Sequence, residues 1–397
     1  MKNYLVGIAA ICVLLCILAS AGCVSDPAQT SAESGGGLTG TAAALIDEIS
    51  GLQDGNIVIS TYSINQALGM VLAGAENVCR TELETYLGTS NAENLAANTV
   101  LRSRLDSLQN TKLTSANSVW FNTGFQAAES YQETLKSAFD AEIKEADFSS
   151  AAITDAINAW CAEKTNNLIK KIADPSQLKN AEAVLINAVY LKAEWLKKFR
   201  DWANTEETFK GLAGDTEVAM MHGTESVYLE NAQAVGFKKY YGDNIAFIGI
   251  LPKKTGDFTL KNLNLASLLD SQTYEYDVKI GIPKFSAEFS MNLAEPLKKL
   301  GLSNVFSDEA DSFDGIGRTA AGEPLKIDSI IHKTFLNMDE DGTEAAAVTA
   351  AVMMATSAAP EIKEIKTVVL DRPFAFLIVD EETDTLLFAG KITDIAE

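Results

Sequence analysis

The chain has 397 residues, and 47% of them are hydrophobic, so it can bury a substantial core as one large domain or two ordinary ones. Acidic residues outnumber Lys and Arg by 54 to 32, and the formal net charge of -22 excludes nucleic acid and polyanionic activators as expected partners. The only histidines are His222 and His332, and no HExxH or paired CxxC motif is present, so neither a metal site nor a cofactor is expected.

Residues 1–22 have the layout of a secretory signal. A positively charged start is followed by an apolar run over residues 5–19 and by the small residues Ser20-Ala21-Gly22. The Ala-Gly-Cys ending resembles a lipobox, although Ser20 stands where Leu is usual. In such a motif the cysteine sulfur, here that of Cys23, carries a diacylglycerol. Cleavage without lipid attachment and an uncleaved anchor are the alternatives.

Residues 23–40 are polar, small and rich in glycine, which predicts a flexible tether. No second linker of this kind and no internal repeat follows, so residues 41–397 are expected to form a single domain. Cys79 and Cys161 are predicted to be buried free thiols; a disulfide between them would require the fold to bring them together.

The predicted elements of this domain begin with two helices, at residues 42–52 and 63–73, where apolar residues recur at helical spacing. A short β-branched run, Ile57-Val58-Ile59, lies between them. Strands follow later in the chain and end in a strand-turn-strand pattern. The fold class is therefore predicted as α+β with sizeable sheets. The predicted strands are residues 182–191, 246–251, 278–285, 367–370, 374–379 and 386–392.

Many short motifs, spread in order from Asn56 to Ile392, resemble those of the serpin family of serine protease inhibitors. The quoted motifs are Asn56 to Ile64, Ala67 to Met70, Gly74-Ala75, Ser115 to Trp120, Asp147-Phe148, Ile157 to Trp160, Asn187 to Trp195, Ile282 to Phe285, Gly301-Leu302, Val305-Phe306, His332-Lys333, Glu340 to Ala347, Asp371 to Phe374 and Leu387 to Lys391. With its lipobox, the chain resembles an inhibitory, prokaryotic lipoprotein-like member. Thr61 and Ala193 depart from the family's usual Pro and Gly.

The resemblance implies helices around a large, mostly antiparallel central sheet, with smaller sheets and an exposed reactive loop at about residues 340–360. A protease cleaves this loop, which then inserts into the central sheet as a new strand and traps the acylated protease. The residues implied for the loop hinge are Glu340, Gly342, Thr343, Glu344, Ala345, Ala346, Ala347 and Thr349. Those implied for the region where the sheet opens are Ser60, Ser63, Asn187, His332 and Trp195.

The loop composition is compatible with insertion. Every second residue from Thr343 to Ala351 is Thr or Ala, small enough to be covered inside a sheet, while Glu344 falls on the other face. No proline occurs between Glu340 and Thr356, so every amide can donate to a ladder. Composition alone also predicts an Ala-rich surface helix capped by Thr343.

Family spacing places the reactive bond at Thr356-Ser357, with Met354 and Ala355 as alternatives for the residue before the bond. No basic residue precedes the bond, which favours elastase-like or subtilisin-like serine proteases, with chymotrypsin-like enzymes second. The inhibitor is expected to be a monomer that forms a covalent complex with the protease. It is expected to be tethered to the outer face of the cell membrane through Cys23, with a soluble extracellular protein as the alternative. The alternatives are a non-inhibitory serpin acting as chaperone or carrier and, more remotely, a surface hydrolase using a serine and His332.

Overall fold

The computed structural model describes residues 38–178, 181–307, 312–323, 325, 327, 330–343 and 363–395. All of these residues belong to one compact unit, residues 36–397, which contains helices and three larger sheets. The predicted α+β class is confirmed. The first helix begins at Leu38, three residues before the expected start of the folded body.

The helices concentrate in the first half of the described chain. Helix α2 begins where the Ser60 hydroxyl accepts a hydrogen bond from the Ser63 amide, and α4 begins with a capping box between Ser90 and Glu93. The described helices are α1 (Leu38–Ser50), α2 (Thr61–Gly74), α3 (Asn77–Leu87), α4 (Asn91–Asp106), α5 (Glu129–Phe139), α6 (Ala152–Lys164), α7 (Pro175–Leu178), α8 (Leu265–Asp270) and α9 (Ala294–Lys299), with short 3-10 helices η1 (Asp201–Ala203) and η2 (Lys261–Leu263).

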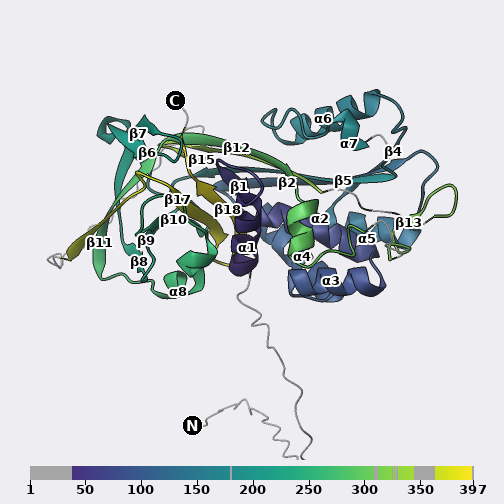
Figure 1. The fold of residues 1–397 in the computed structure, drawn as a ribbon, viewed down its shortest axis with the longest axis horizontal. Coiled ribbons are helices and arrows are strands. Elements are labelled where there is room, and N and C mark those ends of the chain that lie inside the picture. Colours follow the sequence, from purple (N-terminus) through teal and green to yellow (C-terminus); the bar gives the residue numbers. More distant parts are fainter. Residues whose placement is uncertain are drawn as a thin grey trace, which may run out of the picture. The chain divides into compact units, whose positions relative to one another are not determined.

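The central sheet has the strand order β12-β14-β15-β5-β2-β4 and is antiparallel except for the β2–β4 pair. Figure 1 shows α6 and α7 on one side of it and α2 to α5 on the other. Its strands are β2 (Thr111–Asn122), β4 (Glu142–Ala146), β5 (Ala183–Glu194), β12 (Phe285–Asn292), β14 (Ile331–Met338) and β15 (Gly342–Thr343).

Two further sheets complete the body, with strand orders β1-β18-β17-β10-β9-β8 and β16-β11-β7-β6, and β13 pairs with β3 separately. Their strands are β1 (Ile57–Ile59), β3 (Gln126–Ala127), β6 (Thr205–Lys210), β7 (Asp215–Glu225), β8 (Val227–Glu230), β9 (Ala234–Tyr240), β10 (Ile245–Pro252), β11 (Tyr276–Pro283), β13 (Gly317–Arg318), β16 (Glu364–Val369), β17 (Phe374–Asp380) and β18 (Thr385–Ile392).

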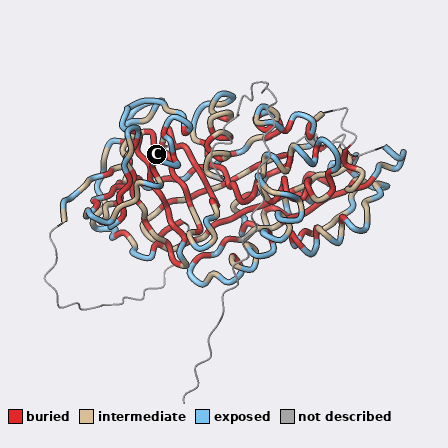
Figure 2. Tube along the Cα trace, turned by 90° about the horizontal axis from the view of Figure 1, so that it is seen from below, coloured by how far each residue is buried: buried red, intermediate tan, exposed pale blue. Residues whose placement is uncertain are grey.

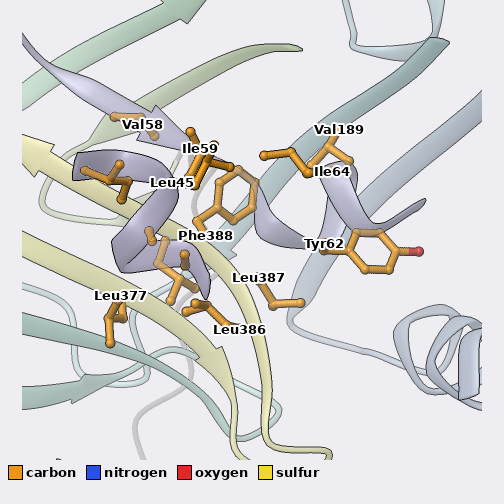
Figure 3. Packing of buried hydrophobic residues seen from close by; sticks show 14 of the residues in the cluster. Leu45, Val58, Ile59, Tyr62, Ile64, Val189, Leu377, Leu386, Leu387 and Phe388 are labelled. Atoms are coloured by element: carbon orange, nitrogen blue, oxygen red, sulfur yellow. The ribbon is translucent and has the colours of Figure 1, made fainter. Parts of the chain in front are cut away.

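One large hydrophobic cluster joins the sheets to the early helices, and a smaller one lies under α6. Figure 2 shows buried backbone running through the sheets, with exposed segments at the periphery. Figure 3 shows Ile59, Ile64 and Phe388 of β1, α2 and β18 close together in the large cluster. Cys79 belongs to the large cluster and Cys161 to the small one; both are unpaired and buried, as predicted.

The predicted helices and strands correspond to observed elements, but the strand predicted over residues 278–285 is correct only as far as Pro283. The chain leaves β11 at Pro283 and enters β12 at Phe285, so the predicted segment serves two different sheets. Only Lys284 separates the strands, and its amide still bonds to the Ala219 carbonyl at 2.8 Å. None of the described helices combines the length and apolar character needed to span a membrane.

Candidate functional site

The middle of the central sheet contains an unusual arrangement of strands. Both β5 and β14 run antiparallel to β15 and therefore parallel to each other, and β15 lies between them. The recorded pairs of β15 are Thr343 with Met338 on one side, and Gly342 with Glu194 and Thr343 with Ala193 on the other. Among the described residues, β5 and β14 share no ladder. We call the position between them, continuing from Thr343, the insertion position.

Gly342 is required for the chain to enter this position. Its φ of +150° is unfavourable for residues with a side chain, and an added Cβ would lie 2.0 Å from the Ala193 carbonyl oxygen. The neighbouring Thr343 is buried opposite Ala193, which is itself fully buried. The methyl group of Ala193, at a position where the family usually has Gly, therefore fits beside Thr343.

We call residues 339–343 the hinge segment, and an aromatic cluster holds it. The Trp195 indole nitrogen donates to the Asp339 carbonyl at 3.0 Å, and the Trp195 amide donates to the Asp341 carbonyl at 2.8 Å. Trp195 stacks on Tyr241 with ring centroids 4.1 Å apart, and the Tyr241 hydroxyl is 2.8 Å from Thr343 Oγ1. Thr343 therefore lies in a strand, with its hydroxyl directed at Tyr241, while the residues of the alternative Ala-rich helix lie outside the described residues.

A buried cation supports the aromatic cluster. Lys239 Nζ lies 4.3 Å from the centroid of Phe199 and 5.1 Å from that of Trp195. The same ammonium donates to Glu225 Oε1 at 2.9 Å and to the Lys197 carbonyl at 2.7 Å. Burial lowers the pKa of Lys239 and the Glu225 carboxylate opposes that shift. Removing the Glu225 carboxylate would leave the buried Lys239 ammonium with the Lys197 carbonyl but without a compensating charge.

Ion pairs fasten the hinge segment on its more exposed side. Glu340 accepts from Lys284 Nζ at 2.8 Å and from Asn204 Nδ2 at 2.6 Å. Burial would raise the pKa of Glu340, but the Lys284 ammonium outweighs it and the pKa lies below its usual value. Lys198 bonds to Asp341 at 2.9 Å and to Glu194 at 3.0 Å, so it ties the hinge segment to the end of β5.

A second, neutral set of polar groups lies farther along β5 and β14. The Ser60 amide donates to His332 Nε2 at 3.1 Å, and the Ser60 hydroxyl donates to the Leu387 carbonyl at 3.0 Å. The Ser63 hydroxyl donates to Asn187 Oδ1 at 2.5 Å. The structure thus brings Ser60, Ser63, Asn187 and His332, which are far apart in sequence, to the start of α2, whereas Trp195 lies at the hinge segment.

The neutral network extends to residues that the sequence did not single out. Asn187 Nδ2 donates to Asn117 Oδ1 at 2.6 Å and to Ser115 Oγ at 3.1 Å. Asn117 in turn donates to the Phe139 carbonyl at 2.7 Å and contacts Gln66, which bonds to Asn98. Ser115 and Asn117 stand in an alternating strand, so their residue types alone indicate surface positions. The family motif Ser115 to Trp120 includes both residues, but it does not indicate which side chains they contact.

His332 is unsuited to catalysis in this position. It is 3% exposed, and burial lowers its pKa to about 3, so the ring is neutral and its Nε2 accepts from a backbone amide. A general base needs a pKa near the working pH and a hydrogen bond from its nucleophile. The arrangement therefore contradicts a hydrolase built on a serine and His332.

Several predicted site residues lie outside the described residues: Glu344, Ala345, Ala346, Ala347, Thr349, Met354, Ala355, Thr356, Ser357 and Cys23. Thr61 is described, and its hydroxyl bonds to the Leu386 carbonyl. Within the described ranges, no group of three or more His, Cys, Asp or Glu side chains could hold a metal ion. His222 lies on β7, where its Nε2 is 2.6 Å from Glu207.

Comparison with known proteins agrees with this geometry. A family profile described as serpin (serine protease inhibitor) matches residues 37–395. A serpin-like protein of Thermococcus kodakarensis is 35% identical, over 88% of this chain and 82% of its own, and Serpin-Z10 of Arabidopsis thaliana is 30% identical, over 85% and 91%. The crystal structure of the thermophilic serpin Tengpin in its native state has a TM-score of 0.78 at 29% identity, covering 94% of this chain and 96% of its own. The chain therefore belongs to the serpin family.

Proposed function

We propose that this serpin inhibits serine proteases as a suicide substrate. Cleavage of the loop between Thr343 and Lys363 would free its first part to extend β15 through the insertion position. The observation that carries the proposal is the pairing of Gly342 and Thr343 between β5 and β14, where these residues already start the strand that insertion would complete. At present β5 and β14 run parallel to each other on either side of the insertion position. A new strand in that position would form an antiparallel ladder with each of them.

The register of β15 specifies how the loop would enter. Continuing the pairs of Thr343 with Ala193 and Met338 brings residues 344–353 opposite residues 192–183 of β5. The alternate small residues of the loop then follow Leu191, Val189 and Asn187, whose side chains are buried. These residues share the face of the large hydrophobic cluster, where a bulky or charged side chain would be costly.

One loop residue would reach the neutral network. Six residues after Thr343 is Thr349, six before Ala193 is Asn187, and six before Met338 is His332. The Thr349 hydroxyl would therefore arrive between the amide and the imidazole, which can exchange hydrogen-bond partners without leaving a buried polar group unsatisfied. At about 1 kcal/mol per hydrogen bond, the new ladders would release on the order of ten kcal/mol.

The proposed reactive bond is Thr356-Ser357, with cleavage after Met354 or Ala355 as alternatives. The preceding residues are small or medium and uncharged, which suits the primary pockets of elastase-like and subtilisin-like enzymes, with chymotrypsin-like cleavage second. The proposed partner is thus a serine protease held in a covalent complex with a monomeric inhibitor. Lipid attachment at Cys23 would place this complex at the outer face of the cell membrane.

The test is to mix the full chain, in mild detergent, with subtilisin, elastase, chymotrypsin and trypsin, and to examine the products by denaturing gels and mass spectrometry. We expect an adduct that survives SDS with subtilisin or elastase, and a released peptide that begins at Ser357. Clean cleavage with full protease activity remaining would overturn the proposal and indicate a non-inhibitory serpin.

A loop variant tests the proposed register. Thr349→Arg would place a charge between Asn187 and His332, so insertion should stall and most of the chain should be cleaved as a substrate instead of forming an adduct. Glu344→Gln is the control, because it changes the net charge by the same one unit at a residue that would lie on the other face, opposite the partly exposed Lys192. Equal loss of adduct in both variants would contradict the register.

A further inference from the structure

A cavity of about 500 Å³ lies where α2, α4 and the turn between β17 and β18 meet. Its lining includes Tyr62 and Asn65 from α2, Asn94 and Val100 from α4, and Thr383 from the turn. It shares no residue with β5, β14 or the hinge segment. We call this cavity the α2–α4 pocket. Sites for small molecules have volumes of about 300–1,000 Å³, so the pocket can hold one such ligand.

The lining of the α2–α4 pocket is uncharged. None of the described residues that line it is Asp, Glu, Lys or Arg, although 22% of the chain is charged. Three other cavities of about 300 Å³ or more each include charged residues, such as Asp106 and Lys112 in one of them. Glu382, which precedes Thr383 in the chain, pairs with Arg104 at 3.2 Å. A charged ligand would therefore lose its water in the α2–α4 pocket without gaining a partner of opposite charge.

Apolar side chains supply part of the lining, and one of them reaches far into solvent. Val100 is 66% exposed on α4, although it is hydrophobic. Leu87, Ala97 and Leu101 line the same pocket. A ligand that covers these side chains removes apolar area from water, which favours an occupant with an apolar body.

The pocket is also lined by four side-chain amides, of which only two have protein partners. Gln66 bonds to Asn98, and Asn98 Nδ2 donates to the Ala138 carbonyl at 2.5 Å, so the neutral network holds both side chains in place. The Asn65 and Asn94 side chains, in contrast, make no hydrogen bond to another described residue, and Asn94 Oδ1 is buried. Buried polar groups are nearly always bonded, and an amide offers both donors and an acceptor. Asn65 and Asn94 can therefore bond to a neutral polar group of a ligand.

We propose that the α2–α4 pocket binds an uncharged small molecule that has an apolar body and one amide or hydroxyl group. The apolar body would cover Val100 and Leu101, and the polar group would bond to Asn65 and Asn94. A helix of a partner protein does not fit, because a helix about 10 Å wide fills about 500 Å³ in little more than one turn. Binding needs neither a protease nor the reactive loop, so this inference does not rest on the proposed function.

The experiment is a titration of the full chain, held in lipid nanodiscs, with N-benzylhexanamide. Saturation-transfer NMR measures the bound ligand, and empty nanodiscs give the blank for partition into lipid. We expect saturable binding with a Kd below about 1 mM. The matched charged probe is the same amide with a carboxylate at the end of its hexanoyl chain, and it should bind at least about 10-fold more weakly.

Two neighbouring residues of α4 allow the site to be located. Ala96 and Ala97 are both exposed, but only Ala97 lines the pocket. Ala97→Trp should fill the pocket and raise the Kd at least about 10-fold, whereas Ala96→Trp, the matched control, should stay within about 2-fold of wild type. Asn65→Leu keeps the size of the side chain and removes its amide, so it should raise the Kd about 3-fold to 10-fold. Urea unfolding checks that each variant is folded.

Three outcomes would overturn the inference. The first is no saturable binding beyond that of empty nanodiscs, and the second is equal binding by Ala97→Trp and Ala96→Trp, which would place the probe elsewhere. The third is equal affinity for the neutral probe and its carboxylate analogue, which would contradict an uncharged ligand. If Ala97→Trp does not fold, wild-type affinity in Asn65→Leu would overturn the inference in its place. None of these measurements involves a protease adduct, so failure of the proposed function would leave the test intact.

Discussion

At the hinge segment the contacts of the central sheet are charged and aromatic, whereas farther along the same strands they are neutral. Glu340 and Asp341 pair with Lys284 and Lys198 where the side chains reach solvent. Around Asn187, in contrast, hydroxyls, amides and one neutral imidazole bond to one another away from water. Both regions border the insertion position, yet they are built from different groups.

The difference follows from what each region would do when a strand enters. Charged groups near the surface can regain water when their ion pairs separate, so the hinge segment can open without burying an unpaired charge. The neutral region is covered by helices and has no such access, as the early helices beside the sheet show in Figure 1. Only groups that can exchange one neutral partner for another would permit a strand to pass there. The predictions below test this division.

The largest expected effect is at the point where the chain turns into the insertion position. Gly342→Val should displace the hinge segment, because its side chain would meet the Ala193 carbonyl and because φ is positive. We expect a loss of roughly 2–5 kcal/mol in the free energy of unfolding, together with loss of adduct formation. Urea unfolding and the gel assay with subtilisin measure the two effects.

Gly256→Val is the control for this variant, since Gly256 also has positive φ, +95°, but an added Cβ would meet nothing within 4 Å. It reports the backbone strain alone. If both variants lose the same stability and both still form adduct, close packing against Ala193 is not what requires glycine at position 342.

The neutral region should respond to pH through His332. Its pKa is about 3 in the fold against 6.5 for the free side chain, so the unfolded chain binds the extra proton between these values. Stability from this residue is complete above pH 6.5 and declines as the pH falls, by about 1.4 kcal/mol per pH unit. From pH 6.5 to 4.5 the loss is therefore about 2 kcal/mol, measurable as a falling urea midpoint.

His332→Gln keeps an acceptor for the Ser60 amide and removes the titrating ring, so its urea midpoint should fall less steeply over the same range than that of the wild type. His222→Gln removes the chain's other histidine, which lies on β7, and is the control for loss of a histidine elsewhere in the chain. Identical slopes for His332→Gln and the wild type would show that other groups control the acid response.

Elements with a clear period were predictable from sequence, and contacts between distant segments were not. The spacing of apolar residues in α1 and α2 and the strand-turn-strand pattern of β17 and β18 predicted their type correctly. Nothing local to Lys239 or Tyr241 indicates a cation or a hydroxyl beneath the hinge, because their partners come from other strands. The division at Lys284 was also missed, although Gly281 and Pro283 just before it are residue types that often mark the end of a strand.

The smallest expected effect concerns the charged contacts themselves. Glu340→Lys would place two ammonium groups together at Lys284 and leave Asn204 without its carboxylate partner. Because Lys284 is partly exposed, the cost should be only about 1–2 kcal/mol, and Glu340→Lys/Lys284→Glu should recover part of it. Glu48→Lys, at the more exposed pair with Lys299, is the matched control and should cost less than about 1 kcal/mol.

Raising the salt concentration should reduce the difference in stability between Glu340→Lys and wild type, since salt screens partly exposed charges. It should leave the acid response of His332 in place. A salt-independent cost at Glu340 would mean that the hinge segment is held by packing and neutral hydrogen bonds, and the contrast between the two regions would then rest on the aromatic cluster alone.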